Sequence, residues 1–287
     1  MPEAHTDVAG AGAGIPRDAY FDQQAAFWDD VYSGTDVYSV IHQRRHATAV
    51  AWIARLPLAP GARVVDVGCG TGVTAVALAR RGLEVTAVDA VQSMVERARR
   101  RADDAGVAER MTFAVQDAEA LELADGEVDL VVALGVIPWL AEPESGLHEM
   151  ARVTKEGGWI VVSADNSARL NYALDPWLNP RLASARAGIK RVAKTRNSGA
   201  GAKSQLHSTR EFDSMLAAAG FEHEIAALLG FGPFTLLGQK LIPDALGIAL
   251  DRRLQRLAAR APLLGARAAQ YLVLGRRRAG EPRPVAP

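Results

Sequence analysis

The residues best suited to chemistry form a run of glycines with an acid in front of it. Gly68, Gly70 and Gly72 alternate with small residues directly after a valine-rich segment. Asp66 lies inside the end of that segment, two residues before the first glycine. A strand that leads into a helix through glycines brings backbone amides and the positive end of the helix close to a ligand. Because a carboxylate here would repel a pyrophosphate and attract a cation, the stretch predicts a site for a ligand with a positively charged group.

Two other uses of this stretch fit it less well. A dinucleotide-binding loop spaces its glycines as G-x-G-x-x-G, whereas the glycines here follow G-x-G-x-G behind an acid. Cys69 would be the nucleophile of a covalent mechanism, but no base or orienting residue is indicated for it. We therefore expect neither a nicotinamide enzyme nor a cysteine-dependent one, and we interpret Cys69 as a small residue in a tight turn.

The composition narrows the class of protein. The chain has 287 residues and a formal net charge of zero, so no bulk attraction to nucleic acid is encoded. Its single cysteine rules out an intramolecular disulfide and fits a reducing compartment. We see no apolar run long enough to span a bilayer, and the N-terminus lacks the basic-then-apolar order of a signal peptide. We expect a cytoplasmic protein with no nucleic-acid partner.

Strands and helices are expected to alternate through the middle of the chain. Such alternation implies a parallel sheet covered by helices on both faces, with ligands beyond the carboxyl ends of the strands. The strands are expected at residues 64–67, 83–88, 111–115, 128–133 and 159–164, with helices that include 73–79 and 145–153. Polar residues at the strand ends place one site at that edge: Asp66, Asp89, Asp117, Asp165 and Asn166.

The rest of the chain is expected to form additions to this core. We expect a flexible tail over residues 1–18, because apolar side chains are too few there to offset the entropy of ordering. A helical lid rich in aromatic residues is expected over 19–60, the binding core over 61–166 and an insertion or cap over 167–208. The end of the core with a helical insertion is expected over 209–276, and a disordered tail over 277–287.

The last helix of the lid is expected over residues 40–56, because prolines follow it. Its apolar residues predict which side meets the core. We expect Ile41, Val50 and Ile53 to face inward and Arg44, Arg45 and His46 to lie on another side.

Four segments, in order, carry a resemblance to a known family. They are Val-Asp-Val-Gly-Cys-Gly-Thr-Gly (65–72), the acid Asp89, Gln-Asp-Ala (116–118) and Asp-Leu-Val-Val-Ala-Leu-Gly-Val-Ile-Pro-Trp (129–139). This set resembles the motifs of class I S-adenosylmethionine-dependent methyltransferases and is similar to the bacterial branch with the ubiquinone- and menaquinone-type enzymes. The resemblance covers residues 63–164. It implies an α/β fold: a Rossmann-like, seven-stranded, mostly parallel sheet with helices on both faces, an N-terminal helical lid and C-terminal insertions.

The resemblance also implies S-adenosylmethionine as the cofactor. Asp66 would lie near its amino group and sulfonium, and Asp89 would accept both ribose hydroxyls. Asp117 with the Ala118 amide would read the adenine edge, while Met94 would pack on the adenine or serve only as a core residue. The resemblance places the following residues at the cofactor, the last two through backbone contacts to its amino-acid end: Asp66, Gly68, Cys69, Gly70, Thr71, Gly72, Asp89, Ala90, Met94, Asp117, Ala118, Leu134 and Gly135.

A hydroxyl acceptor would be helped by a general base, and histidine is the usual base near neutral pH. His42, His46 and His207 are the candidates, because their segments can cover the strand ends. A surface or packing role stays open for each of them. We see no two histidines and an acid at the spacing of a metal site, so we expect no metal.

The acceptor is inferred from the fourth motif and the additions. That motif reads Leu-Gly-Val-Ile-Pro-Trp, not the Asn/Asp-Pro-Pro-Tyr/Phe of enzymes that methylate amino groups of nucleic acids. We therefore expect O-methylation of a small molecule: a natural product, sugar, lipid or quinone-like compound. The residues expected around it give a mostly apolar rim: Tyr38, Trp139, Asn166, Arg169, Tyr172, Phe231 and Phe234.

Two alternatives stay open. The same fold without catalysis would be a scaffold or interaction protein, although the intact glycines and acids speak against it. The loop 231–237 and the amphipathic helix after it, expected at about residues 243–260, would make a weak contact with a membrane surface if the acceptor is lipid-linked, and the basic stretch 190–203 would contact anionic headgroups or a phosphate. The simpler interpretation of these segments is an ordinary covering element and a solvated loop.

Overall fold

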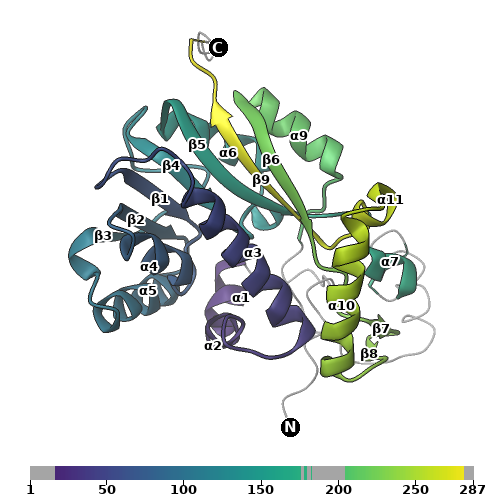
Figure 1. Ribbon diagram of the computed structural model, residues 1–287. Coiled ribbons are helices and arrows are strands. Elements are labelled where there is room, and N and C mark those ends of the chain that lie inside the picture. The colour runs from purple at the N-terminus through teal and green to yellow at the C-terminus, as the bar shows by residue number, and fades with distance from the viewer. Residues whose placement is uncertain (1–16, 176–177, 180–181, 183–203, 281–287) are drawn as a thin grey trace.

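The computed structural model describes residues 17–175, 178–179, 182 and 204–280 (Figure 1). Residues 1–16 of the expected N-terminal tail lie outside the described residues, and helix α1 (Arg17–Gln23) includes its last two positions. The basic stretch 190–203 and residues 281–287 of the expected C-terminal tail also lie outside them.

One seven-stranded sheet runs through the molecule in the order β3-β2-β1-β4-β5-β9-β6 (Figure 1). Strands β1 to β5 pair in parallel: β1 (Arg63–Val67), β2 (Glu84–Asp89), β3 (Met111–Val115), β4 (Val128–Ala133) and β5 (Thr154–Asp165). Strand β9 (Gln270–Arg277) lies antiparallel between β5 and β6 (Phe221–Leu229). The mostly parallel sheet predicted from the sequence is confirmed.

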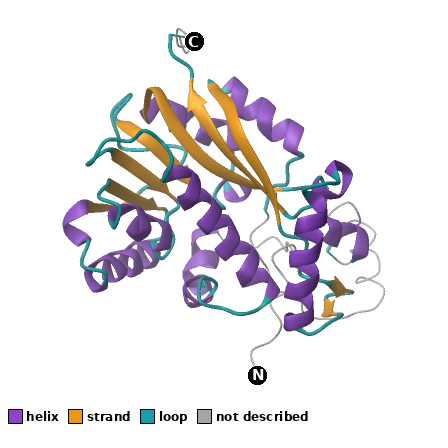
Figure 2. Ribbon diagram, in the orientation of Figure 1, coloured by secondary structure: helices purple, strands orange, loops and turns teal. Residues whose placement is uncertain are grey.

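Helices cover both faces of the sheet (Figure 2). Helices α3 (Val37–Ile53), α4 (Val73–Ala79) and α5 (Gln92–Asp104) share one apolar cluster with Val64. Helices α6 (Pro143–Val153) and α9 (Thr209–Ala218) share the opposite cluster with Val65. Because neighbouring strand residues point to opposite faces, the continuous valine run of β1 serves both clusters.

Two element boundaries differ from the expected ones for local reasons. Strand β5 begins at Thr154, not at residue 159, and continues through Gly157, whose φ of 71° bends the strand; the pair Gly157-Gly158 favours a turn when only the sequence is considered. Helix α3 begins at Val37 and ends at Ile53, about one turn earlier than expected at each end. Its start is set by Asp36, whose side chain accepts a hydrogen bond from the Ser39 amide at 3.1 Å.

The N-terminal lid consists of α1, α2 (Ala25–Asp30) and α3. Its aromatic residues pack across the end of the sheet, where the Phe21 ring meets Trp139 edge-on at 5.1 Å between centroids. On the other side of the lid, Asp29 forms ion pairs with Arg97, at 3.2 Å, and with Arg101. The lid is therefore held to both α5 and the 3-10 helix η2 (Ile137–Trp139).

The C-terminal addition has a small core of its own. It comprises α7 (Leu170–Leu174), β7 (Thr235–Leu236), β8 (Gln239–Lys240), α10 (Asp244–Ala258) and α11 (Pro262–Gly265). Phe231 and Phe234, expected at the acceptor, are buried here among apolar residues that include Leu254. Asp251 on α10 accepts a hydrogen bond from the Phe231 amide at 2.8 Å and pairs with Arg44 on α3 at 2.7 Å. The placement of these two phenylalanines at the acceptor is thus corrected, because they hold the addition together.

Two kinds of feature are absent from the part of the chain that the structure describes. None of its helices combines the length and apolar character that crossing a bilayer requires. None of its His, Cys, Asp and Glu side chains gather in groups of three or more that would hold a metal ion.

Candidate active site

A pocket opens at the carboxyl ends of β1, β2, β4 and β5, under the N-terminal lid. It contains about 1150 Å³ of unfilled space, including the part open to solvent. The glycine loop and Asp89 line its inner end. Aromatic residues of the lid, together with Trp139, line the outer end, and two of them, Phe21 and Trp28, also pack against Val91 and Met94 beside Asp89. This is the edge of the sheet at which the sequence places the site.

The glycine loop has a shape that side chains would prevent. Gly68 has a φ of 62°, and a Cβ atom there would lie 2.4 Å from Cγ2 of Val136. Gly72 has a φ of 81°, and a Cβ atom there would lie 2.8 Å from the Cβ of Ala98 on α5. Both positions therefore need glycine for conformation and for space. Four residues of the loop line the pocket: Gly68, Cys69, Gly70 and Thr71. Gly72 lies behind them.

Cys69 is a wall residue without nucleophilic character. Its amide donates a hydrogen bond to the Val88 carbonyl at 2.9 Å, which fixes the loop to β2. Burial, with Asp89 and Asp66 nearby, raises the pKa of its thiol well above the ordinary value. Since the thiolate is the reactive form, this position supports the interpretation of Cys69 as a small residue in a tight turn.

Asp89 is fixed at the end of β2 by two backbone amides. Its Oδ2 accepts from the Gly70 amide at 2.8 Å, and its Oδ1 accepts from the Val91 amide at 3.0 Å. A carboxylate oxygen can accept more than one hydrogen bond, so both oxygens can still accept bonds from a ligand in the pocket. The glycine loop and the acid of the next strand thus form one rigid unit.

Asp66 lies beneath the loop and is not among the residues of the pocket wall. It is 3% exposed, and its Oδ2 has no hydrogen-bond partner among the described residues. Burial, and secondarily the charge of Asp89, raises the pKa of Asp66 to about 7. The sequence places Asp66 near a cationic group of the ligand. Because Asp66 lies beneath the loop, its charge would act on that group through the loop, without direct contact.

The loop after β3 forms the next part of the wall with Gln116, Asp117 and Ala118, opposite Met94 on α5. Asp117 Oδ1 accepts a hydrogen bond from the Glu119 amide at 3.1 Å, which turns the chain back sharply. Met94 is only 2% exposed and also packs in an apolar cluster with Val91. The two roles considered for Met94, wall and core, therefore coexist.

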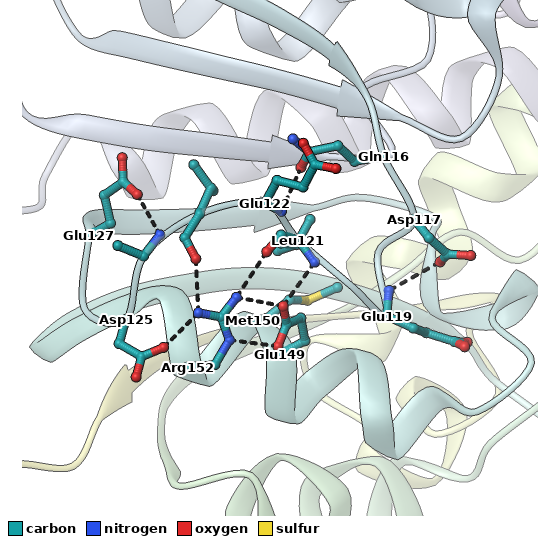
Figure 3. A network of polar contacts seen from close by, with 12 residues as sticks. Gln116, Asp117, Glu119, Leu121, Glu122, Asp125, Glu127, Glu149, Met150 and Arg152 are labelled. Carbon is teal, nitrogen blue, oxygen red and sulfur yellow. Dashed lines mark hydrogen bonds and ion pairs between the residues drawn. The ribbon is translucent and has the colours of Figure 1, made fainter.

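Arg152 on α6 holds the rest of this loop in place (Figure 3). Its guanidinium donates to the carbonyls of Leu121 and Leu123, at 2.9 and 2.8 Å, and pairs with Asp125 and Glu149, both at 2.6 Å. Glu149 in turn accepts from the Leu121 amide at 2.8 Å. Arg152 therefore ties the chain that follows Asp117 to helix α6 (Figure 3).

Arg45 is a pocket residue on α3, which the sequence assigned to one side of that helix together with Arg44 and His46. The side chain is 4% exposed, lines the pocket, and has a buried Nε without a hydrogen-bond partner among the described residues. Its guanidinium lies against the backbone of Gly135, where a Cβ atom would be 2.9 Å from one terminal nitrogen. The signal was present in the sequence, since Arg45 lies four residues after Ile41 and four before Ala49, both buried. A buried cation of this kind suits a carboxylate or phosphate of a ligand.

Aromatic rings form the outer end of the pocket. Phe21, Trp28, Tyr38 and Trp139 all line it. Trp28 and Tyr38 lie 6.5 Å apart between ring centroids, and Phe21 lies between Trp28, at 5.9 Å, and Trp139, at 5.1 Å. Tyr38 and Trp139 were predicted at the acceptor, and they lie at this end. The other two rings come from the lid, where the sequence identified the aromatic segment but not the individual residues.

Asp165, the last residue of β5, contributes a carboxylate to the aromatic end of the pocket. Asp165 lines the pocket and pairs with Arg169 at 3.0 Å. The Arg169 guanidinium lies over the ring of Tyr172, 4.8 Å from its centroid. Arg169 and Tyr172 were predicted to contact the acceptor, and they lie behind Asp165 as its support. Asp165 itself was recognised only as a polar residue at a strand end.

Asn166 does not reach the pocket wall. Its side-chain amide donates to the carbonyls of Ala266 and Ala268, at 3.0 and 2.8 Å. It therefore joins the end of β5 to the C-terminal addition. The expected contact with the acceptor is corrected to a structural role.

Of the three candidate histidines, His42 is on the pocket wall and His46 and His207 are not. His42 Nδ1 donates to the Tyr38 carbonyl at 2.9 Å, so its Nε2 is the acceptor toward the Gln270 amide at 3.3 Å. Burial, and secondarily the cation of Arg45, lowers the pKa of His42 to about 3. With both nitrogens engaged and the neutral form favoured, His42 is poorly suited to take a proton.

Comparisons with known proteins agree with this geometry. Residues 65–162 match the family model of a methyltransferase domain. The chain is 33% identical over 228 residues to a demethylmenaquinone methyltransferase of Beutenbergia cavernae, covering 75% of this chain and 86% of that protein. It is 38% identical over 146 residues to a demethylmenaquinone methyltransferase of Renibacterium salmoninarum, covering 50% of this chain and 58% of that protein.

The chain belongs to the class I S-adenosylmethionine-dependent methyltransferases, in their bacterial small-molecule branch. The solved structure of a magnesium protoporphyrin IX methyltransferase from Synechocystis PCC 6803 has the same fold. It matches with a TM-score of 0.62 over 91% of this chain and 97% of that one, at 18% identity.

The residues of this methyltransferase fit the family's cofactor, S-adenosylmethionine. Gly70 of the glycine loop faces open space, since a Cβ atom there would meet no atom within 4 Å, and Asp89 offers two fixed carboxylate oxygens. The buried, incompletely bonded Arg45 lies at Gly135, whose own amide already donates to Ser163 Oγ at 2.8 Å. Together they match a ligand that has a nucleoside at one end and an amino acid at the other.

Proposed function

We propose that this methyltransferase moves a methyl group from S-adenosylmethionine to an oxygen atom of a small, largely apolar acceptor. The observation that carries the proposal is the continuity of one pocket. Its inner end is formed by the glycine loop, Asp89 and Arg45, and its outer end by aromatic rings beside Asp165. Donor and acceptor would therefore meet in one enclosed space, where alignment and exclusion of water supply much of the rate enhancement.

The inner end would hold the cofactor, which supplies a methyl group already activated on a sulfonium. Asp89 accepts hydrogen bonds from the ribose hydroxyls, and the loop of Asp117 and Ala118 meets the adenine edge. Arg45 would bind the carboxylate of the amino-acid end, since its buried Nε has no hydrogen-bond partner among the described residues. Asp66, beneath the loop, adds negative potential below the cation when it is ionised.

The outer end would hold an acceptor with a flat, apolar body. Rings from three separate elements, Phe21, Tyr38 and Trp139, face this space and favour stacking or edge contacts with another ring. Two relatives carry the name demethylmenaquinone methyltransferase, and a third, from Paracidovorax citrulli and 31% identical over 148 residues, carries the name ubiquinone biosynthesis O-methyltransferase. These names support a quinone-like acceptor, and the third supports oxygen as the methylated atom. Neither the pocket nor the neutral net charge favours nucleic acid.

Asp165 is the group that would take the acceptor's proton. It lines the pocket, whereas His46 and His207 do not, and His42 has both nitrogens engaged. The cofactor would supply the methyl group that the acceptor oxygen gains, and Asp165 would take the proton that the hydroxyl loses. Arg169 and Tyr172 fix the direction of that carboxylate.

The experiment has two stages. Calorimetric titration with S-adenosylmethionine tests whether the inner end binds the cofactor. Incubation with methyl-labelled cofactor and a panel of phenols, catechols and hydroquinones, followed by mass spectrometry, tests the acceptor. An O-methylated product supports the proposal, and label on a ring carbon would overturn the oxygen assignment. Binding without any labelled product across the panel and cell extracts would favour a cofactor-binding scaffold, and no binding heat would remove the proposal altogether.

A further inference from the structure

The C-terminal addition carries a surface in which leucines are exposed next to arginines. Helix α10 is docked on the protein through the side that carries Gly247, Asp251 and Leu254. The opposite side is open to solvent, where Leu246 is 60%, Leu250 37% and Leu257 48% exposed. These three leucines follow each other at intervals of four and seven residues, so they form one stripe along the helix.

The hairpin of β7 and β8 and helix α11 add leucines at the two ends of α10 (Figure 1). Leu236, Leu237 and Leu241 of the hairpin region are 43%, 61% and 54% exposed, and Leu263 on α11 is 88% exposed. The hairpin is joined to the start of α10 by the ion pair of Lys240 with Asp244 at 2.9 Å. We call the exposed leucines of these three elements, with the basic residues below, the leucine–arginine face.

The charge of this face is strongly positive. Residues 235–267 contain six basic and two acidic side chains, in a chain whose formal net charge is zero. Both acids are already paired, Asp244 with Lys240 and the buried Asp251 with Arg44. The basic residues exposed on α10 and beyond it therefore keep their charge for an external partner: Arg252, Arg253, Arg256, Arg260 and Arg267.

We infer that the leucine–arginine face rests on the surface of an anionic lipid bilayer. An amphipathic helix with leucines and arginines binds such a surface by burying its apolar side chains and by attraction to anionic headgroups. A second copy of the chain is a poorer occupant, because a two-fold interface would bring like-charged arginines against each other. The large exposed side chains of the face are leucines and not aromatic rings, so stacking on nucleic-acid bases is not provided for.

The sequence left open a membrane contact by the loop 231–237 and the helix after it. In the structure Phe231 and Phe234 of that loop are buried in the core of the addition, whereas Leu236 and Leu237 at its end and the exposed leucines of α10 belong to the face. The face lies on the solvent side of this core. Helix α10 packs against α3 on its other side, where Gly247 contacts Val37 and Asp251 pairs with Arg44. Helix α3 also carries Tyr38, His42 and Arg45 of the pocket, so the bilayer would lie behind a wall of the site.

Vesicle co-sedimentation tests the inference with the full chain and no acceptor. The probes are vesicles of phosphatidylcholine alone and of phosphatidylcholine with about one third phosphatidylglycerol. We expect binding to the second kind, weakened by salt. Replacing Arg253 and Arg256 by Ser should lower the partition constant about fivefold for each charge removed. Leu246→Glu with Leu250→Glu should abolish binding.

Matched controls separate a specific face from general effects of charge or polarity. Arg80→Ser with Arg81→Ser removes two exposed charges at the end of α4, and Ile225→Glu places an acid at an equally exposed apolar site on β6. Both controls should keep vesicle binding, and thermal melting should show that every variant is folded. Absence of binding to anionic vesicles, or equal losses in the controls, would overturn the inference.

Two further readouts distinguish other outcomes. Analytical ultracentrifugation would reveal a dimer, and a dimer that the leucine variants dissociate would assign the face to a second copy and overturn the bilayer assignment. Asp89→Ala should leave vesicle binding unchanged, because it acts at the cofactor. The two proposals can therefore be refuted separately. Vesicle binding without methyl transfer would refute only the proposed activity, and methyl transfer without vesicle binding would refute only the bilayer contact.

Discussion

The two ends of the pocket are built in different ways. The inner end is mainly backbone from turns that directly follow strands, such as the glycine loop after β1 and the amides around Asp89. The outer end is made of side chains from elements far apart in the chain, from Phe21 on α1 to Asp165 on β5. A site made by local turns leaves a short motif in the sequence, whereas a site assembled across the fold does not. The comparison also predicts that mutations at the two ends affect different kinetic constants.

The largest effect is expected at the outer end from Asp165→Asn. The variant keeps the size of the side chain but cannot take a proton, so kcat should fall by about 100-fold or more. Cofactor affinity should stay within about twofold, because the inner end is untouched. Steady-state kinetics and calorimetric titration measure the two quantities. A test with more acidic phenols should recover part of the loss, since their protons leave more easily.

The control for this variant is Asp129→Asn. Asp129 also pairs with a cation, Lys155 at 2.6 Å, but lies outside the pocket wall. It should change kcat by about twofold at most. If Asp165→Asn instead weakens the cofactor and leaves kcat unchanged, Asp165 belongs to the inner end and the division proposed above is wrong.

The next effect is expected at the inner end from Asp89→Ala. The variant removes a carboxylate that fixes the loop and accepts from the ribose, and we expect a loss of about 100-fold in cofactor affinity. Asp104→Ala, an exposed acid at the end of α5, is the control. Activity at saturating cofactor should recover much of the wild-type kcat. Unchanged affinity in the titration would remove the ribose assignment.

Arg45→Ala should weaken the cofactor less, by about 30-fold, because one charge-assisted contact is lost at one end of the ligand. Arg45→Lys should restore only part of this, since an ammonium cannot form the same two parallel hydrogen bonds. 5′-Methylthioadenosine, which has no amino-acid end, provides the internal control. Its affinity should be equal in wild type and Arg45→Ala, and an equal loss for both ligands would show a general disturbance of α3.

Much of the fold and the inner end could be predicted from the sequence, because each strand and each glycine turn is specified by its own neighbours. Asp89 and the glycine loop are examples. Arg45 was not assigned to the site, because an arginine on a helix is ordinarily solvated, although its spacing from Ile41 and Ala49 puts it on the buried side of α3. Phe231 and Phe234 show the opposite error. Their apolar side chains fit an acceptor site as well as a core, and only the packing of α10 decides between them.

The last effect concerns stability and not the kinetic constants, through the titration of Asp66. Burial raises the pKa of this carboxyl to about 7 in the folded protein, against an ordinary value of about 3.9 in the unfolded chain. Between these values the folded protein holds a proton that the unfolded chain has released. The free energy of unfolding should therefore fall as pH rises through this window, by up to about 1.4 kcal/mol per pH unit from this group, and level off above it.

Urea unfolding at a series of pH values between about 5 and about 8 measures this slope. Asp66→Asn should remove the contribution, because the amide does not titrate, and should make the protein more stable than wild type at the upper end. Bound cofactor should also flatten the wild-type dependence of the free energy of unfolding on pH. Its cationic groups would lie above Asp66 and would favour the ionised form of that carboxylate. A wild-type slope that Asp66→Asn leaves unchanged would mean that another group titrates. A slope insensitive to the cofactor would separate Asp66 from the inner end of the pocket.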